Sequence, residues 1–214
     1  MRWRRAQIPA ERTIVLVRHG NYVPDPKIDE KIGPHLSPLG SAQAHLAGGL
    51  AGMPGRFDGM YVCPMQRARD TAAIIGERFP GCPFEVVGDL AECVPPTWRT
   101  DAVKDYSRKE QADCEAAINR DFVRFFKPAI GSPQRDLLVC HGDVIRYLVT
   151  RALRVDTMAW LEMSVGNASI TVIRVQPDGR MKVISVGDVG HIPPNLQSGA
   201  TGEPERSLAV PALQ

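Results

Sequence analysis

Short apolar, β-branched runs alternate along this sequence with longer segments whose apolar residues recur at helical spacing. The runs occupy residues 13–17, 58–62, 84–87 and 136–140 and are typical of short buried strands. The helical patterns are a segment that starts at Ser37-Pro38, then 65–79, 101–127, 143–153 and 156–163. This alternation predicts a three-layer α/β sandwich, with a mainly parallel central sheet and helices on both faces.

The final part of the sequence departs from this alternation. Two further runs, 168–175 and 180–186, flank the turn Pro177-Asp178-Gly179 and predict an antiparallel hairpin at the edge of the sheet. From Pro193 onward the chain is rich in small residues and has no periodicity, so 198–214 is expected to be a disordered tail. We expect a leader at 1–12 and a single domain over 13–197.

Composition and charge exclude several classes of function. The 214 residues are 43% hydrophobic and 23% charged, as in soluble globular proteins. The net charge of +2 is too small to predict nucleic-acid or membrane binding, and no apolar run approaches the roughly 20 residues that span a bilayer. The cysteine count of five is odd and shows no Cys-x-x-Cys pair, which indicates neither a disulfide framework nor a zinc site. A cytoplasmic location is therefore expected.

Two histidines follow directly on predicted strands. Arg18-His19-Gly20 ends the first strand, and His141-Gly142 ends the strand at 136–140. In an open α/β sheet, catalytic groups gather beyond the carboxyl ends of the strands, so we expect the two rings to meet. Arg18 would hold an anion, and Gly20 lets the backbone approach a ligand. His19, with its second nitrogen held by an acceptor such as a backbone carbonyl, is the candidate nucleophile toward phosphorus.

Other residues complete a candidate phosphate site. Arg67 lies in the first turn of its predicted helix, where free N–H groups and the helix dipole also favour an anion. His141 is expected to be a cationic donor to phosphoryl oxygens, whereas Cys140 should belong to the core. Phosphoryl transfer to water needs a proton for the leaving group. We choose Glu92, in the loop after the third strand, with Asp143 as the alternative, although a role as helix N-cap explains Asp143 more simply.

The same residues count against a metal. No His-x-x-x-His or His-x-x-Glu spacing occurs, and Arg18 beside His19 would repel a divalent cation. We therefore expect no metal ion and no cofactor.

These motifs resemble the histidine phosphatase superfamily, which has the phosphoglycerate-mutase-like fold. Arg-His-Gly follows the first strand, Arg67-Ala-x-x-Thr-Ala lies on a helix, and a late strand ends in His-Gly. The resemblance implies that His19 is phosphorylated, that Arg18, Arg67 and His141 bind the phosphoryl group, and that Glu92 donates the proton. It also places Asn21 where the family often has another polar phosphate neighbour.

Within that superfamily the chain resembles the mitochondrial phosphoglycerate-mutase-like serine/threonine protein phosphatases. The resemblance rests on residues 141–153, Trp160-Leu161, 167–171 and 187–194 and extends over about 13–197. That family carries a membrane anchor and an oligomerisation motif that we do not recognise here, so neither property is transferred. Glycolytic mutases carry Glu-Arg-His-Tyr-Gly near the acid, and this chain has Glu92-Cys-Val-Pro-Pro, which counts against a mutase.

The expected function is a metal-independent phosphomonoesterase that works through a phosphohistidine. Its expected substrate is phosphoserine or phosphothreonine on a protein. The alternatives are a phosphatase of small metabolites such as sugar phosphates, and a phosphate-binding or scaffold module without turnover. We expect no nucleic-acid or membrane partner and leave a homo-oligomer open.

Overall fold

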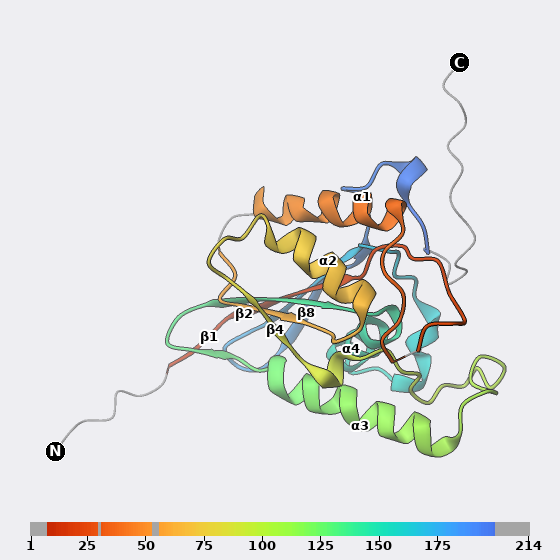
Figure 1. The fold of residues 1–214 in the computed structure, drawn as a ribbon. Coiled ribbons are helices and arrows are strands. Elements are labelled where there is room, and N and C mark those ends of the chain that lie inside the picture. The colour runs from red at the N-terminus through yellow and green to blue at the C-terminus, as the bar shows by residue number, and fades with distance from the viewer. Residues whose placement is uncertain (1–7, 30, 53–55, 200–214) are drawn as a thin grey trace.

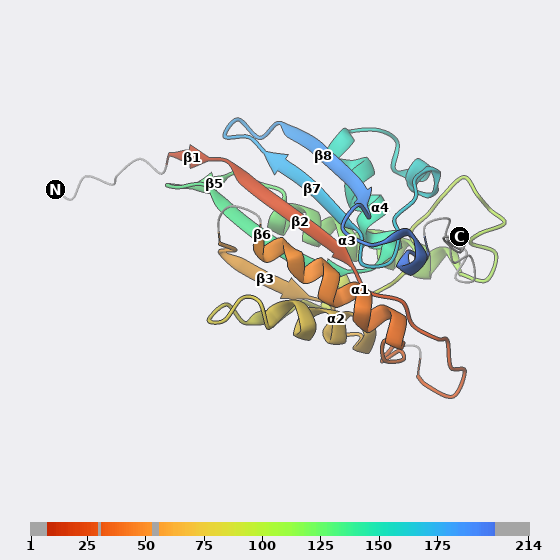
Figure 2. The same ribbon diagram turned by 90° about the horizontal axis from the view of Figure 1, so that it is seen from above.

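The computed structural model describes residues 8–29, 31–52 and 56–199. Its centre is a six-stranded sheet with the order β4-β3-β6-β2-β7-β8 (Figure 2). The strands are β2 (Arg12–Arg18), β3 (Gly59–Val62), β4 (Phe84–Val86), β6 (Gln134–Cys140), β7 (Ile170–Val175) and β8 (Met181–Asp188). The first four strands of that order are parallel, and β7 and β8 continue the sheet as an antiparallel hairpin. The predicted sheet is confirmed.

Helices cover both faces of the sheet, as the sequence predicts. Helices α1 (Pro38–Ala47) and α2 (Gln66–Gly76) lie on one face, and α3 (Arg108–Phe125) and α4 (Gly142–Leu153) lie on the other (Figure 1). Short 3₁₀ segments occupy Gly48–Gly52, Gly88–Leu90, Thr157–Glu162 and Pro194–Leu196. The three-layer architecture is thereby confirmed.

The centre of the sheet explains why its strands could be recognised. Ile14, Val15, Leu16 and Val17 of β2 are fully buried, and so are the residues of β6 from Leu137 to Cys140. Parallel strands covered on both faces have continuous apolar runs rather than alternating ones. The same two strands lie side by side and carry the two histidines at their carboxyl ends.

Helix starts agree with the sequence at α1 and differ at α3 and α4. The Ser37 side chain accepts a hydrogen bond from the Gly40 N–H at 3.0 Å, as an N-cap does. Helix α3 begins at Arg108 rather than 101, because Ser107 and Glu110 form a capping box there. Residues 101–105 form turns instead.

The prediction that Asp143 caps α4 is wrong. His141 occupies the N-cap position of α4 and makes no capping hydrogen bond with its side chain. Asp143 lies in the first turn, where its carboxylate accepts a hydrogen bond from Arg146 Nη1 at 2.9 Å. Asp143 is two residues past the N-cap, so its side chain is not in the position from which a capping residue accepts from the first N–H groups of the helix.

The predicted leader and tail are only partly within the described residues. Strand β1 (Pro9–Ala10) pairs with β5 (Ala129–Ile130), a ladder too short to leave a periodic pattern. Ser198 is buried and donates a hydrogen bond to Asn167 Oδ1 at 3.1 Å, so the packed chain continues past 197. Residues 1–7 of the leader and 200–214 of the tail lie outside the described residues.

The expectation of no disulfide is wrong. Cys93, in the loop after β4, is bonded to Cys114 on the buried side of α3. Their 21-residue separation matches no motif, so only the packing of α3 against this loop brings them together. The bond fixes the loop that carries Glu92 to a long helix.

We expect reduction of this disulfide to lower the free energy of unfolding by about 3 kcal/mol, because it closes a loop of this size in the unfolded chain. Urea unfolding of the wild type with and without a dithiol reductant measures the difference. Reductant should not affect a Cys93→Ser/Cys114→Ser variant, whereas Cys82→Ser, which alters a free cysteine, should respond as the wild type does. Equal unfolding midpoints for oxidised and reduced wild type would contradict this prediction.

Candidate active site

Three neighbouring parallel strands end at one edge of the sheet, and each is followed by a residue of the site. His19 follows β2, His141 follows β6 and Cys63 follows β3. The sheet hydrogen bonding continues into these residues: the His19 N–H donates to the Cys140 carbonyl and the Cys63 N–H to the Val139 carbonyl. The expected meeting of the two rings is confirmed, with centroids 4.9 Å apart.

The His19 ring is held in one tautomer. Its Nδ1 lies 2.8 Å from the Gly20 carbonyl oxygen, which can only accept, so Nδ1 carries the proton. Its Nε2 accepts a hydrogen bond from Arg67 Nε at 3.2 Å. Burial, and then the charges of His141, Arg18 and Arg67, lower the pKa of His19 well below 6.5. The ring is therefore neutral at physiological pH and directs a lone pair at a guanidinium.

The backbone around His19 is fixed from both sides. The His19 carbonyl accepts hydrogen bonds from the Ala168 N–H at 3.1 Å and from Asn167 Nδ2 at 3.2 Å. A Cβ on Gly20 would lie 2.4 Å from the Gly40 carbonyl oxygen, so glycine is needed for the close approach of α1. These contacts keep the ring in place without help from a ligand.

Asn21 lies next to the site and has structural contacts. Its Oδ1 accepts a hydrogen bond from Ser37 Oγ at 2.7 Å, and its backbone N–H donates to Gln43 Oε1. These bonds join the loop after His19 to the start of α1. A contact between Asn21 and phosphate stays a prediction.

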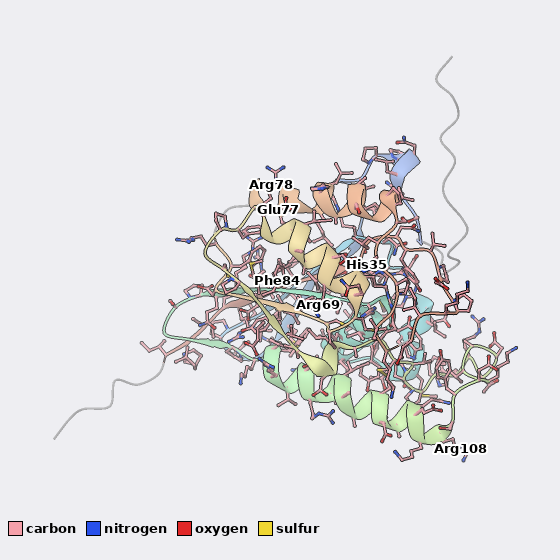
Figure 3. All side chains as sticks on the ribbon, in the orientation of Figure 1. His35, Arg69, Glu77, Arg78, Phe84 and Arg108 are labelled. Atoms are coloured by element: carbon pink, nitrogen blue, oxygen red, sulfur yellow. A yellow bond between two sulfur atoms is a disulfide. The ribbon has the colours of Figure 1, made fainter. Side chains whose placement is uncertain are left out.

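Arg67 is the centre of the cluster. From the first turn of α2 its Nη2 lies 3.2 Å from His141 Nδ1 and 3.8 Å from Glu92 Oε2, while its Nε reaches His19. Its guanidinium also lies over the Tyr22 ring, 4.8 Å from the centroid. By contrast Arg69, two residues on, is exposed on the outside of α2 near His35 (Figure 3).

Arg18 is half-buried, and its Nε lies beside Gly142, the residue after His141. Its Nη1 donates to the carbonyls of Val165 at 2.6 Å and Gly199 at 3.1 Å, which fixes the direction of the side chain. Its Nε is buried and has no hydrogen-bond partner among the described residues. A phosphoryl oxygen would satisfy that N–H, as the sequence-based assignment of Arg18 requires.

His141 differs from the expectation in its charge. Burial, and then the charges of Arg67 and Arg18, lower its pKa well below 6.5, so the ring is neutral rather than cationic. The ring is fully buried, with Nδ1 3.1 Å from Glu92 Oε2 and Nε2 2.8 Å from Cys63 Sγ. A neutral ring can still donate one hydrogen bond to a phosphoryl oxygen.

Glu92 is the carboxyl group that faces both histidines. Its Oε1 is buried and has no hydrogen-bond partner within the described part of the chain. Burial raises its pKa, and the charges of Arg67 and Arg18 only partly offset this effect. The alternative acid, Asp143, is paired with Arg146 and lines a separate cavity. The geometry favours Glu92.

A cavity of about 580 Å³ opens onto Arg67 and Glu92. Tyr22, Met65, Val94 and Tyr106 are among its mainly apolar walls. Among the described residues that line it, Arg67 is the one cation. A second cavity of about 630 Å³ shares Val94 and Tyr106 with the first and contains Arg99 and Arg146.

A metal ion is the other ligand to consider. One ligand atom each from His19, Glu92 and His141 lie within 4.8 Å of one another. Arg67 donates directly to the Nε2 lone pair of His19 that a metal would need, which places a cation at the centre of the cluster. The donors therefore suit an anion better than a divalent cation.

Sequence reasoning missed Cys63 and Tyr22. Cys63 could have been found by the strand-end argument, because it follows the predicted strand 58–62 just as the histidines follow theirs. The Tyr22 ring lies 5.4 Å from the His19 ring, but a loop tyrosine leaves no pattern in the sequence.

A neutral histidine whose lone pair faces an arginine, a second arginine close by and a raised carboxyl pKa fit a site for phosphoryl transfer through a histidine nucleophile. The comparisons with known proteins agree. The chain belongs to the histidine phosphatase superfamily (branch 1), whose model matches residues 14–188.

Among curated proteins, the chain is similar to the mitochondrial serine/threonine-protein phosphatases Pgam5 of Caenorhabditis elegans and PGAM5 of Homo sapiens. The identities are 39% and 34% over 195 residues, which cover 87% of this chain. The chain spans 66% and 65% of the length of these two relatives.

Solved structures with the same fold include a phosphoglycerate mutase from Plasmodium falciparum, with a TM-score of 0.60 and 26% identity. That comparison covers 86% of this chain and 95% of the mutase. A mycobacterial glucosyl-3-phosphoglycerate phosphatase has a TM-score of 0.60 at 21% identity and covers 83% and 99% of the two chains. The latter likeness concerns the fold alone.

The expectation of a cytoplasmic location is wrong. The curated relatives are named as mitochondrial proteins, and the Cys93–Cys114 disulfide removes the argument for a reducing compartment. Within the described residues, no helix combines the length and apolar character that crossing a membrane requires.

Proposed function

We propose that this chain is a metal-independent phosphomonoesterase with His19 as the nucleophile. The observation that carries the proposal is the neutral His19 ring, whose Nε2 lone pair faces Arg67 while Nδ1 is held by the Gly20 carbonyl. The catalytic domain is proposed to span residues 13–197.

The reaction has two steps. In the first, His19 Nε2 attacks phosphorus, the bond to the leaving oxygen breaks, and Glu92 gives that oxygen its proton. In the second, water attacks the phosphohistidine, the Glu92 carboxylate takes a proton from the water, and the P–N bond breaks. Arg67, Arg18 and an N–H of His141 stabilise the charge on the phosphoryl oxygens in both steps.

We expect chelators such as EDTA to leave activity unchanged, because the charge on the phosphoryl oxygens is met by Arg18 and Arg67. Vanadate, which adopts the trigonal-bipyramidal geometry of the transferring phosphorus, should inhibit competitively. The measurement is turnover of p-nitrophenyl phosphate over a range of each compound. Loss of activity in EDTA that one divalent ion restores would assign the His19–Glu92–His141 cluster to a metal instead.

For the substrate we propose phosphoserine and phosphothreonine on protein. The relatives carry serine/threonine-protein phosphatase in their names. The cavity at the site supports the same choice, since among the described residues that line it Arg67 is the one cation, and the further arginines, Arg99 and Arg146, lie in the second cavity. The second cavity continues this surface, which suits a peptide longer than a single residue.

A substrate panel tests this proposal and its alternatives. Phosphoserine and phosphothreonine peptides should have kcat/KM values at least about tenfold above those of hexose phosphates and phosphoglycerate, a difference of about 1.4 kcal/mol in transition-state stabilisation. The reverse order would favour a small-molecule phosphatase, the activity named for several proteins of the same fold. No turnover of p-nitrophenyl phosphate would favour a binding module.

A further inference from the structure

The proposed mechanism makes no use of Cys63, yet this thiol touches the site. Its Sγ lies 2.8 Å from His141 Nε2, and both residues are fully buried. The contact follows from strand pairing: Val62 of β3 pairs with Val139 of β6, so Cys63, one residue on, and His141, two residues on, lie at the same edge of the sheet (Figure 2).

We propose that Cys63 is a positioning residue that fixes the tautomer of His141 and so turns the Nδ1–H of that ring toward the phosphoryl group. The inference rests on the proposed function of the site, and it concerns which of the two ring nitrogens carries the proton.

The direction of the hydrogen bond follows from the surroundings of the sulfur. The Met65 N–H donates to Sγ at 3.3 Å, so the sulfur is already an acceptor there. Burial raises the pKa of Cys63 to about 12, which keeps the thiol protonated. The protonated thiol has one S–H to donate, and a carboxylate oxygen, Glu92 Oε2, lies 3.1 Å from His141 Nδ1, where it can accept an Nδ1–H. Both contacts are satisfied when the S–H donates to Nε2 and Nε2 is unprotonated.

The proton of the neutral His141 ring then lies on Nδ1. This nitrogen is 3.1 Å from Glu92 Oε2 and 3.2 Å from Arg67 Nη2, so it faces the space between the acid and the phosphate-binding arginine. In this tautomer Nδ1–H and Arg67 Nη2–H are two donors 3.2 Å apart, and a phosphoryl oxygen bound between them would accept from both. In the opposite tautomer a lone pair would face the phosphoryl oxygens, and the two would repel each other.

The test compares side chains that keep or remove the donor at position 63. Cys63→Ser keeps an O–H, whereas Cys63→Ala and Cys63→Val do not, and Val also fills the space of the sulfur. Cys140→Ala is the matched control, because it removes an equally buried thiol for which the structure shows no hydrogen bond to the His141 ring. Two readouts are used: ¹⁵N NMR of the His141 ring, and the rate of His19 phosphorylation in the first turnover.

We expect the wild type, Cys63→Ser and Cys140→Ala to show the Nδ1–H tautomer of His141. Cys63→Ala and Cys63→Val should shift it toward Nε2–H and slow phosphorylation by about 10–100-fold, the usual range for loss of an orienting partner. Cys63→Ser should stay within a few-fold of the wild type.

Three results would overturn the proposal. They are an Nε2–H tautomer in the wild type, an unchanged tautomer in both donor-free variants, and a loss in Cys63→Ser as large as that in Cys63→Ala. An Nε2–H tautomer in the wild-type spectrum would overturn the proposal even if the variants fail to fold, and the comparison of Cys63→Ser with Cys63→Ala separates the part of Cys63 from that of Glu92. Because the tautomer is measured without turnover, an inactive protein would contradict the proposed function and leave this inference to be judged separately.

Discussion

His19→Ala is expected to abolish both turnover and the labelling of the protein by phosphate. The ring supplies the attacking lone pair, and Arg67 or Arg18 cannot replace it. Loss of a nucleophile of this kind costs on the order of 10⁴–10⁶-fold in kcat. The measurement is a quenched reaction with a ³²P-labelled substrate, followed by localisation of the label.

The stability of the label identifies the bond. A phosphoramidate on His19 is labile to acid and stable to base, whereas a phosphoserine ester behaves in the opposite way. His45→Ala, which removes an exposed histidine from the last turn of α1, is the control and should keep wild-type activity and labelling. Wild-type activity in His19→Ala, or an acid-stable label, would show that another residue carries the phosphoryl group.

Glu92→Gln is expected to slow phosphorylation by a phosphoserine peptide about 10²–10⁴-fold, the usual worth of general acid catalysis. The serine alkoxide needs a proton to leave, and glutamine cannot supply one. The p-nitrophenolate ion leaves largely unaided, so phosphorylation by p-nitrophenyl phosphate should change little. Pre-steady-state bursts isolate this step from dephosphorylation, in which the same carboxylate acts on water for both substrates.

The pH dependence of the phosphorylation rate should show the titration of Glu92. Desolvation raises the pKa of the half-buried Glu92, so its proton is present at low pH and is lost as pH rises through that pKa. Phosphorylation by the peptide should therefore fall at alkaline pH, and this limb should vanish in Glu92→Gln. His19, whose pKa is lowered well below 6.5, stays neutral through that range and loses its lone pair only at acid pH.

A substitution of Asp143 distinguishes Glu92 as the general acid from the alternative, in which Asp143 is the acid. Burial and the neighbouring charge of Glu92 raise the pKa of Asp143 to about 7, so the two carboxyl groups titrate as a pair. Asp143→Asn removes one like charge, which should lower the pKa of Glu92 and move the alkaline limb to lower pH. If Glu92→Gln slows both substrates equally while Asp143→Asn slows only the peptide, Asp143 is the acid.

The positions of His19, His141 and Arg67 could be predicted because they depend on local patterns. Each histidine follows a continuous apolar run, and the carboxyl ends of parallel strands meet at one edge of the sheet. Arg67 lies in the first turn of a helix whose pattern is clear in the sequence. Glu92 lies in a loop, and its choice rested on the chemistry that the reaction needs as much as on position.

The features that were missed depend on contacts between distant segments. The Cys93–Cys114 bond forms because α3 packs over the loop after β4, and the spacing of the two cysteines in the sequence does not predict that packing. The neutral charge of His141 results from burial and from two arginines supplied by other elements. Asp143 was assigned as a cap because residue preferences alone do not show that the helix begins at Gly142, or that the Asp143 carboxylate pairs with Arg146.

The position of β2 in the sheet has a consequence for how the protein is made. Arg12 at the start of β2 pairs with Gln134 on one side and with Val175 on the other, so both neighbours of this strand are synthesised long after it. A ribosome adds about 5–20 residues each second, so both edges of β2 remain unpaired for several seconds. During that time β2 can pair with strands of other chains. The nascent chain carries His19 before β6 and β7 exist, and the site is complete only after both strands have been made.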